Sequence, residues 1–250
     1  MELTAPAVAV TGRPRTTDRA IEAGEPIIRL EDVIRIYREA DVETVALRGV
    51  DLVIQPGEFV AIMGRSGSGK STLLNLLAGS DRPTAGRVVV AGVDLARADE
   101  AERTRLRGRR IGIVYQSQNL VPMLSLVENL SLAASLAGRP MQRPQIEQRL
   151  AMLGLANRGN HRPDQLSGGE QQRAALACVL AADPPILLAD EITGELDSVT
   201  AGEVLDAVAA IHEMAGTTIV LVTHDAAIAA RSDRVVTFRD GKVVSDRRSA

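Results

Sequence analysis

Short apolar runs alternate along the chain with segments in which apolar residues recur at helical spacing. Runs that are almost continuously apolar are typical of strands buried on both faces of a sheet, and they occupy residues 59–63, 111–116, 185–191 and 217–225. Helical spacing marks residues 71–79, 167–182 and 198–216. Buried strands that alternate with helices predict an α/β domain with a mostly parallel sheet covered on both faces.

Other segments predict additions to this core. Strands are expected at 27–36 and 45–54, with hairpins at 86–95 and 233–244. Residues 118–165 carry helical periodicity and no strand signal, so we expect an inserted helical lobe over about 117–183. Residues 1–24 are expected to form a poorly ordered tail ahead of a single domain at 25–250.

Composition limits the kinds of partner that the protein can bind and the compartment in which it is expected. The chain has 250 residues and a net charge of −3, so no overall basic field favours nucleic acid. The arginine-rich stretch 102–110 is interpreted as a solvated helix face rather than a nucleic-acid patch. No run reaches the roughly 18 to 20 apolar residues of a membrane span, and the first residues lack the pattern of a signal peptide. These features predict a cytosolic protein and leave docking onto a membrane partner open.

The strongest chemical pattern is a glycine-rich loop between the strand at 59–63 and the helix that follows it. Its sequence GRSGSGKS matches G-x-x-x-x-G-K-[ST], in which backbone N–H groups and a helix N-terminus surround phosphates. The lysine is one of only two in the chain, against 27 arginines. The alternative is a flexible glycine turn. The predicted nucleotide-binding residues are Gly64, Arg65, Ser66, Gly67, Ser68, Gly69, Lys70, Ser71 and Thr72.

Polar residues follow the neighbouring buried strands. Ser71 and Asp190 are predicted to hold Mg²⁺, and Glu191 to orient and deprotonate an attacking water. Gln116 is expected to bridge the metal and that water, and His224 to contact the γ-phosphate from a strand tip at the same sheet edge. The alternatives are solvated acids that end a strand and a structural histidine.

A second glycine pair lies in DQLSGGEQQR, the signature segment (residues 164–173). Ser167 and Glu170 fit a capping box at a helix start. That fit does not explain Gly168 and Gly169, which cost helix stability and suit a close approach to the backbone. A γ-phosphate could make that approach. The nucleotide bound by a chain's own glycine loop, however, is already assigned to that loop. We therefore expect a second copy, arranged head to tail, to supply the nucleotide that the signature segment covers.

Taken together, LSGGEQQR, the glycine loop, ILLADE and THD resemble the nucleotide-binding subunit of an ABC transporter over about residues 27–246. The resemblance implies a P-loop NTPase fold with a RecA-like core, an antiparallel β subdomain and an inserted α-helical subdomain. It implies that ATP and Mg²⁺ bind, that two copies close around two ATP and hydrolyse it, and that membrane permease subunits dock on the helical lobe. The protein would then lie peripherally on the inner face of the cell membrane.

The resemblance also assigns further roles. Tyr37 matches the aromatic that stacks on adenine, and the alternative is a core aromatic on a strand. Asp197 matches a loop that crosses the dimer interface, and Gln116 matches a lever between the nucleotide and the helical lobe. Ser167, Gly168, Gly169 and Glu170 are counted among the nucleotide-binding residues.

Background residues are similar to the ATPases of lipoprotein-releasing, macrolide-exporting and peptide-exporting systems. Four positions depart from the usual pattern of that group: Tyr115, Gln118, Ile192 and Glu195. Glu195 would put a charge near the predicted dimer interface. Two alternatives to transport are a relative acting in DNA repair or translation and an ATP-binding regulator without turnover. The single cassette and single cysteine argue against the first, and Glu191 argues against the second.

Overall fold

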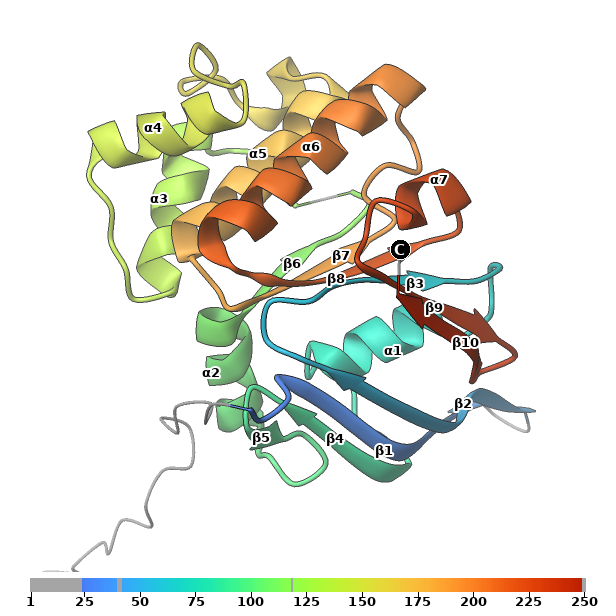
Figure 1. The fold of residues 1–250 in the computed structure, drawn as a ribbon. Coiled ribbons are helices and arrows are strands. Elements are labelled where there is room, and N and C mark those ends of the chain that lie inside the picture. The colour runs from blue at the N-terminus through green and yellow to red at the C-terminus, as the bar shows by residue number, and fades with distance from the viewer. Residues whose placement is uncertain (1–23, 40–41, 118, 249–250) are drawn as a thin grey trace, which may run out of the picture.

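A six-stranded sheet forms the centre of the molecule (Figure 1), and the computed structural model describes residues 24–39, 42–117 and 119–248. The strand order is β10-β9-β3-β8-β7-β6, in which the five strands from β9 to β6 run parallel and β10 returns antiparallel. The strands are β3 (Phe59–Met63), β6 (Ile111–Val114), β7 (Ile186–Asp190), β8 (Thr218–Thr223), β9 (Arg234–Arg239) and β10 (Lys242–Arg248). The predicted parallel sheet is confirmed.

A second, four-stranded sheet has the order β2-β1-β4-β5 and is antiparallel throughout. Its strands are β1 (Ile28–Glu39), β2 (Val42–Ile54), β4 (Ala85–Val90) and β5 (Val93–Asp94). The two N-terminal strands are longer than their apolar patterns predicted. Register shifts interrupt the pairing of β1 with β2, which is why a simple alternation of apolar and polar residues did not reveal their full length.

Helices cover both faces of the six-stranded sheet. They are α1 (Lys70–Leu77), α2 (Glu100–Arg110), α3 (Leu126–Leu136), α4 (Arg143–Met152), the short 3₁₀ helix η2 (Pro163–Gln165), α5 (Gly168–Ala182), α6 (Ser198–Ala215) and α7 (Ala226–Ala229). Figure 1 shows α1 between the two sheets, with α5 and α6 on the opposite face of the six-stranded sheet. The elements α3, η2, α4 and α5 all lie between β6 and β7 in the chain, inside the predicted lobe.

Two hydrophobic cores explain why the central strands are apolar without alternation. On β7, Leu188 belongs to the core around α1, whereas Leu187 belongs to the core beneath α5 and α6. Val220 and Leu221 divide in the same way on β8. Successive side chains of a strand point to opposite faces, and here both faces are dry.

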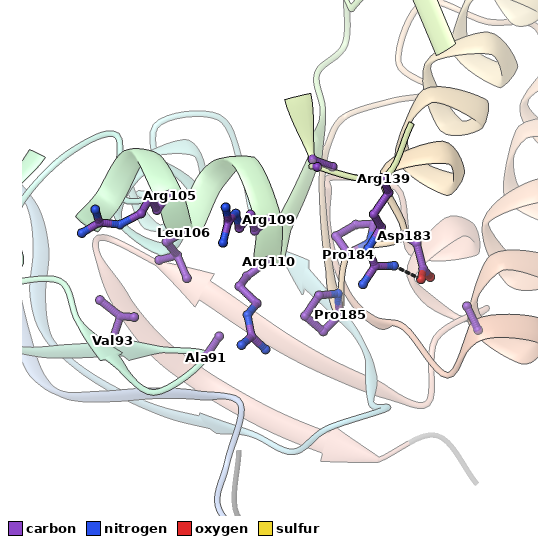
Figure 2. A pocket seen from close by; sticks show the side chains of 13 residues that line it. Ala91, Val93, Arg105, Leu106, Arg109, Arg110, Arg139, Asp183, Pro184 and Pro185 are labelled. Atoms are coloured by element: carbon purple, nitrogen blue, oxygen red, sulfur yellow. Dashed lines mark hydrogen bonds and ion pairs between the residues drawn. The ribbon is translucent and has the colours of Figure 1, made fainter. Parts of the chain in front are cut away.

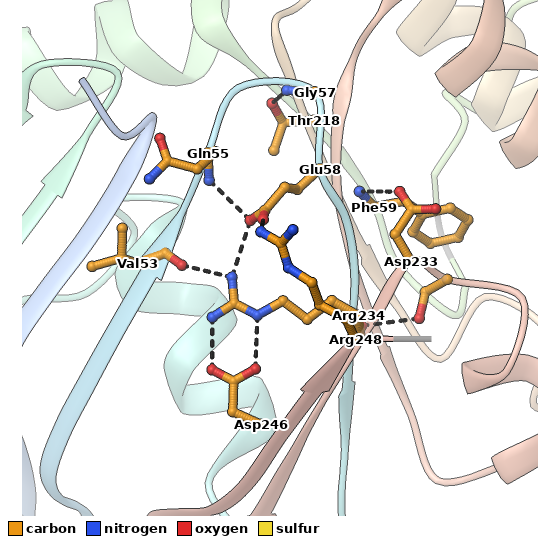
Figure 3. Close-up of polar contacts among 11 residues, drawn as sticks. Val53, Gln55, Gly57, Glu58, Phe59, Thr218, Asp233, Arg234, Asp246 and Arg248 are labelled. Carbon is orange, nitrogen blue, oxygen red and sulfur yellow. Dashed lines mark hydrogen bonds and ion pairs between the residues drawn. The ribbon is translucent and has the colours of Figure 1, made fainter. Parts of the chain in front are cut away.

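An arginine ties the C-terminal hairpin to the central strand (Figure 3). Arg234, at the start of β9, donates to Glu58 Oε2 at 3.0 Å and to the Val53 carbonyl at 2.8 Å. Its Nε and Nη2 also form a bidentate pair with Asp246 at 2.7 and 2.6 Å, and this pair lowers the pKa of Asp246. Because Glu58 directly precedes β3, the network fixes the hairpin beside the strand that leads into the glycine loop.

Two expectations fall on residues that the structure does not describe. The predicted tail at 1–24 lies outside the described residues apart from Gly24, and so does the departure at Gln118. Among the described residues, no helix combines the length and the apolar character that crossing a membrane requires.

Candidate nucleotide site

The glycine loop joins β3 to α1 at the carboxyl edge of the parallel sheet. Gly69 caps α1 with φ 101°, and a Cβ atom there would lie 2.6 Å from the Ala46 carbonyl oxygen. A Cβ atom at Gly64 would lie 2.5 Å from the Phe238 carbonyl oxygen. Only glycine fits either position. No side chain caps α1, so its first N–H groups are directed toward the loop with the positive end of the helix dipole.

Lys70 is held against the floor of this loop and is only 5% exposed. Its Nζ donates to the carbonyls of Gly64 at 2.9 Å and Arg65 at 3.1 Å, and lies 3.8 Å from Glu191 Oε1. A compact ammonium therefore stands between the loop and the acidic tip of β7. The predicted loop lysine and the predicted base lie together.

The proposed metal ligand Asp190 ends β7 beside Ser71. Burial and the negative charge of Glu191 raise the pKa of Asp190, while Ser71 and Lys70 pull it down. Its Oδ1 is buried and has no hydrogen-bond partner in the described structure. An orphaned buried oxygen of this kind costs about 1 to 3 kcal/mol, which a bound cation would offset.

These residues fit Mg²⁺ better than a metal held by several protein ligands. No group of three or more histidine, cysteine or acidic side chains suited to a metal forms among the residues described. Mg²⁺ keeps most of its water shell and needs only one or two carboxylates together with substrate phosphates. Asp190 and the Ser71 hydroxyl meet that requirement.

Glu191 and His224 complete the cleft beside the loop. Glu191 has a φ of 47°, a left-handed conformation that is strained for a residue with a side chain. Its Oε2 lies 3.4 Å from His224 Nδ1, and the His224 side chain is 62% exposed. The cleft is lined by Met63, Gly64, Arg65, Ser66, Gly67, Ser68, Glu191, His224, Thr237, Phe238, Arg239 and Asp240.

The last four lining residues were missed by the sequence analysis. They belong to β9 and its turn, and β9 pairs in parallel with β3. The sequence pattern at 233–244 predicted the hairpin correctly but said nothing of its partner strand. A positive φ at Asp240 and Gly241 shows the turn type, and the RDG sequence was the available signal.

Gln116 lies in a different pocket from Glu191. Its Nε2 donates to Glu195 Oε1 at 3.1 Å, and both residues line a hollow with Gly168 and Leu196. Thus one of the four departures, Glu195, contacts the amide predicted to reach the metal. The Gln116 side-chain oxygen is not used in that bond, and its metal role stays a prediction. Ile192, another departure, is buried in the core under α5 and α6.

Tyr37 lies within β1 rather than after it. Its hydroxyl donates to Asp81 Oδ2 at 2.8 Å, and the Arg35 guanidinium stands 4.4 Å from the ring centroid. A cation therefore covers one face of the ring. The residue is not among those that line the cleft, and adenine stacking stays a prediction for its other face.

The signature segment begins α5 with the predicted capping box. Glu170 N donates to Ser167 Oγ at 3.2 Å, and Ser167 N donates to Glu170 Oε2 at 2.9 Å. Ser167 and Gly168 are exposed, and within the described part of the chain no hydrogen bond or ion pair joins this segment to the glycine loop.

A contact within the same chain explains why residue 169 is a glycine. Gly169 is buried, and a Cβ atom there would overlap the Thr200 methyl group of α6. Asp197 caps that helix, accepting from Val199 N at 3.0 Å and from the Thr200 hydroxyl at 2.6 Å, and these bonds lower the pKa of Asp197. The two adjacent glycines therefore differ, since α6 approaches the buried Gly169, while Gly168 is exposed and its added Cβ would lie 3.3 Å from the Leu196 side chain.

This contact predicts a destabilised Gly169→Ala variant. The added methyl group forces α5 away from α6, and we expect the free energy of unfolding to fall by about 1 to 3 kcal/mol in urea denaturation. Thr200→Ser removes the obstructing methyl but keeps the hydroxyl that Asp197 binds, so the double variant should recover most of the loss. Gly202→Ala in α6 is the matched control, because no atom lies near its added Cβ. Equal stability of Gly169→Ala and the parent would contradict the explanation.

Comparison with known proteins gives consistent matches. The family model described as "ABC transporter" matches residues 47–194. The macrolide export ATP-binding/permease protein MacB of Hyphomonas neptunium is 46% identical over 223 residues, covering 88% of this chain and 34% of the relative. The chain thus spans about a third of that relative's length. An uncharacterized ABC transporter ATP-binding protein of Thermotoga maritima is 44% identical over 219 residues, covering 87% of this chain and 93% of the relative.

A solved structure agrees in fold. It is the dimer of the ATP-binding cassette MJ0796 in a post-hydrolysis state bound to ADP and phosphate. The TM-score is 0.82 at 38% sequence identity, and the alignment covers 89% of this chain and 99% of that one.

Proposed function

This chain belongs to the ABC transporter family and carries its ATP-hydrolysing P-loop cassette, and from that premise we propose that two copies close around two ATP to drive membrane permease subunits. The observation that carries the proposal is the division of the catalytic apparatus. Lys70, Asp190 and Glu191 gather at one sheet edge, while Ser167 and Gly168 stand exposed with no partner among the loop residues.

Each residue of the cleft has a task that its position supports. The α1 N-terminus and the Lys70 ammonium bind and orient the β- and γ-phosphates, because both place positive charge at the loop. Glu191 orients the attacking water and accepts its proton. His224 donates to the γ-phosphate from the tip of β8, in line with its contact to Glu191. Loop residues Arg65, Ser66, Gly67, Ser68 and Thr72 complete the surroundings of the phosphates.

We assign Mg²⁺ to Ser71 and Asp190, with Gln116 as a third contact. Bound there, the ion would neutralise charge that develops on the β- and γ-phosphate oxygens. The unpartnered Asp190 oxygen supports this assignment. Glu195 holds the Gln116 amide by its nitrogen, which orients the amide oxygen away from Glu195.

The partner copy supplies the signature segment. Ser167 and the backbone at Gly168 bring a hydroxyl and the positive end of α5 to the γ-phosphate, and Asp197 lies on the same exposed side at the start of α6. The solved ADP- and phosphate-bound cassette is a dimer, which supports pairing. A full reaction centre then requires two chains.

Permease subunits would dock on the helical lobe. Exposed apolar side chains there include Met123 at 77% and, at the end of α3, Leu136 at 73%. The pocket that holds Gln116 includes Pro122, the neighbour of Met123 in the chain. The relative from Hyphomonas neptunium is named as an ATP-binding/permease protein, which supports a membrane partner of the export type and a peripheral place on the inner face of the membrane. Macrolides are the substrate class that this relative's name favours, and lipoproteins and peptides are the other classes that the background residues of the sequence favour.

A Ser167→Arg variant tests whether the catalytic apparatus is divided between two chains. We expect ATP binding to remain, since Lys70 and its loop are intact, and steady-state phosphate release to fall at least about 100-fold, as when a preorganised transition-state donor is removed. The loss of the cap costs about 1 kcal/mol of stability, so circular dichroism must confirm folding. Ala101→Arg, an exposed change on α2, is the control for added charge and bulk. Full turnover in Ser167→Arg would refute the cross-chain role.

A further inference from the structure

A second pocket lies at the opposite end of the parallel strands from the nucleotide cleft. Arg110 and Pro185, which line it, directly precede β6 and β7, whereas the cleft lies at the carboxyl end of β7. Its walls come from the turn after β4, from α2, from the α3–α4 loop and from the loop before β7. It therefore joins the antiparallel sheet, the core and the helical lobe.

Positive charge dominates this pocket. Figure 2 shows Arg105, Arg109 and Arg110 of α2 on one side and Arg139 of the α3–α4 loop on the other. Asp183 is the single acid among the lining residues, and it is paired with Arg139. The lining thus carries four guanidinium groups and one carboxylate, of which only Arg139 contacts Asp183.

The three α2 arginines differ from their neighbours on the same helix. Arg103 and Arg107 both pair with Glu100, and the Arg103 side chain is buried. Across residues 24–39, 42–117 and 119–248, no ion pair or side-chain hydrogen bond is made by Arg105, Arg109 or Arg110. Arg109 is exposed, and Arg105 Nε, like Arg103 Nε, is buried with no acceptor. The interpretation of residues 102–110 as a solvated face holds for Thr104 and Arg109, which are exposed, and fails for Arg103 and Leu106, which are buried.

This grouping is only partly favourable to the fold, because Arg109 and Arg110 lie in the last turn of α2, where cations interact well with the helix dipole. Like charges at i and i+4, as at Arg105 and Arg109, destabilise a helix, and a buried donor without an acceptor costs free energy. Both effects would be reversed by an anion with several oxygen atoms. Guanidinium groups bind phosphate oxygens in a bidentate manner, which gives them a geometric advantage over single-point donors.

We propose that this pocket binds a small phosphorylated ligand with at least two anionic groups. The α2 arginines contact one anionic group and Arg139 contacts the other, in exchange for its pair with Asp183. Val93, Leu106 and the two prolines at 184–185 provide apolar walls for the body of the ligand. A ligand held in this way connects α2 to the helical lobe and restricts the lobe's movement relative to the sheet.

Isothermal titration with pyrophosphate tests the site. The titration is run without nucleotide or divalent cation, because ADP is itself a diphosphate that the proposed pocket would accept, and the glycine loop accounts for one pyrophosphate site. We expect one further saturable site per chain, weakened about tenfold to a hundredfold in an Arg109→Gln/Arg110→Gln variant and in Arg139→Gln. Arg139 is 54% exposed, so its replacement leaves the core intact. Arg247→Gln, an exposed change on β10 at the other edge of the sheet, should bind like the parent.

A vesicle arm distinguishes the source of the phosphate. If vesicles containing cardiolipin, whose headgroup carries two phosphates, bind the parent, phosphatidylcholine vesicles do not, and the pocket variants lose this binding, the ligand is a lipid headgroup. Pyrophosphate binding alone indicates a soluble ligand. Either result supports the pocket. Absence of saturable binding in both arms overturns the proposal, and so does binding that the pocket variants retain at full strength. Retention of pyrophosphate binding in a Lys70→Ala background separates this site from the glycine loop.

Discussion

Glu191→Gln is expected to bind ATP and yet to hydrolyse it about 100- to 10,000-fold more slowly than the parent. The amide keeps the size of the carboxylate but cannot accept the proton of the attacking water, and general-base catalysis contributes factors of this order. Because ATP is then neither hydrolysed nor released, two chains should stay closed around it. Phosphate release gives the rate, and light scattering with ATP gives the mass of the trapped dimer.

The geometry of Glu191 makes this variant a sharp test. Its side chain lies between Lys70 and His224, and its backbone occupies the left-handed region, so glutamine must accept the same strain. Glu213→Gln, an exposed change on α6, is the matched control and should hydrolyse ATP like the parent. If ATP leaves Glu191→Gln monomeric by light scattering, the assignment of Glu191 as the base is wrong.

Much of the fold could be predicted because the central strands are apolar along their whole length, and such strands are stable only where both of their faces are buried. The run Ile186–Asp190 is buried on both faces, and such strands occur in parallel sheets between helices. The pairing of β9 with β3 could not be predicted, since it joins segments far apart in the chain and depends on contacts such as Arg234 to Glu58. Local periodicity carries no information about such contacts.

In the site, too, the residues placed by local sequence could be predicted, and those placed by tertiary contacts could not. Gly64 to Ser71 and the tip of β7 could be placed from sequence, because a strand, a glycine turn and a helix in succession bring the loop to the sheet edge. Gly169 shows the limit of that reasoning. Its neighbour in space is Thr200, from another helix, and no local pattern distinguishes it from Gly168. The contact of Gln116 with Glu195 is also tertiary and was not visible in the order of residues.

Lys70→Ala is expected to lose ATP affinity by about tenfold to a hundredfold. The ammonium supplies charge-assisted hydrogen bonds to phosphate oxygens, each worth about 1.5 to 3 kcal/mol, and no other lysine can replace it. In the free protein, Nζ is already held by the Gly64 and Arg65 carbonyls, so little side-chain entropy is lost on binding. A fluorescent ATP analogue titrated without turnover measures the dissociation constant directly.

The chain provides a matched control for this loss. Lys242, the other of its two lysines, lies exposed at the β9–β10 turn, and Lys242→Ala should bind ATP like the parent. Removal of the buried Lys70 also leaves Glu191 and Asp190 without their nearest cation, so folding of Lys70→Ala is checked by thermal unfolding before titration. A folded Lys70→Ala chain with unchanged affinity would refute phosphate binding by this loop, and with it the placement of the γ-phosphate beside Glu191.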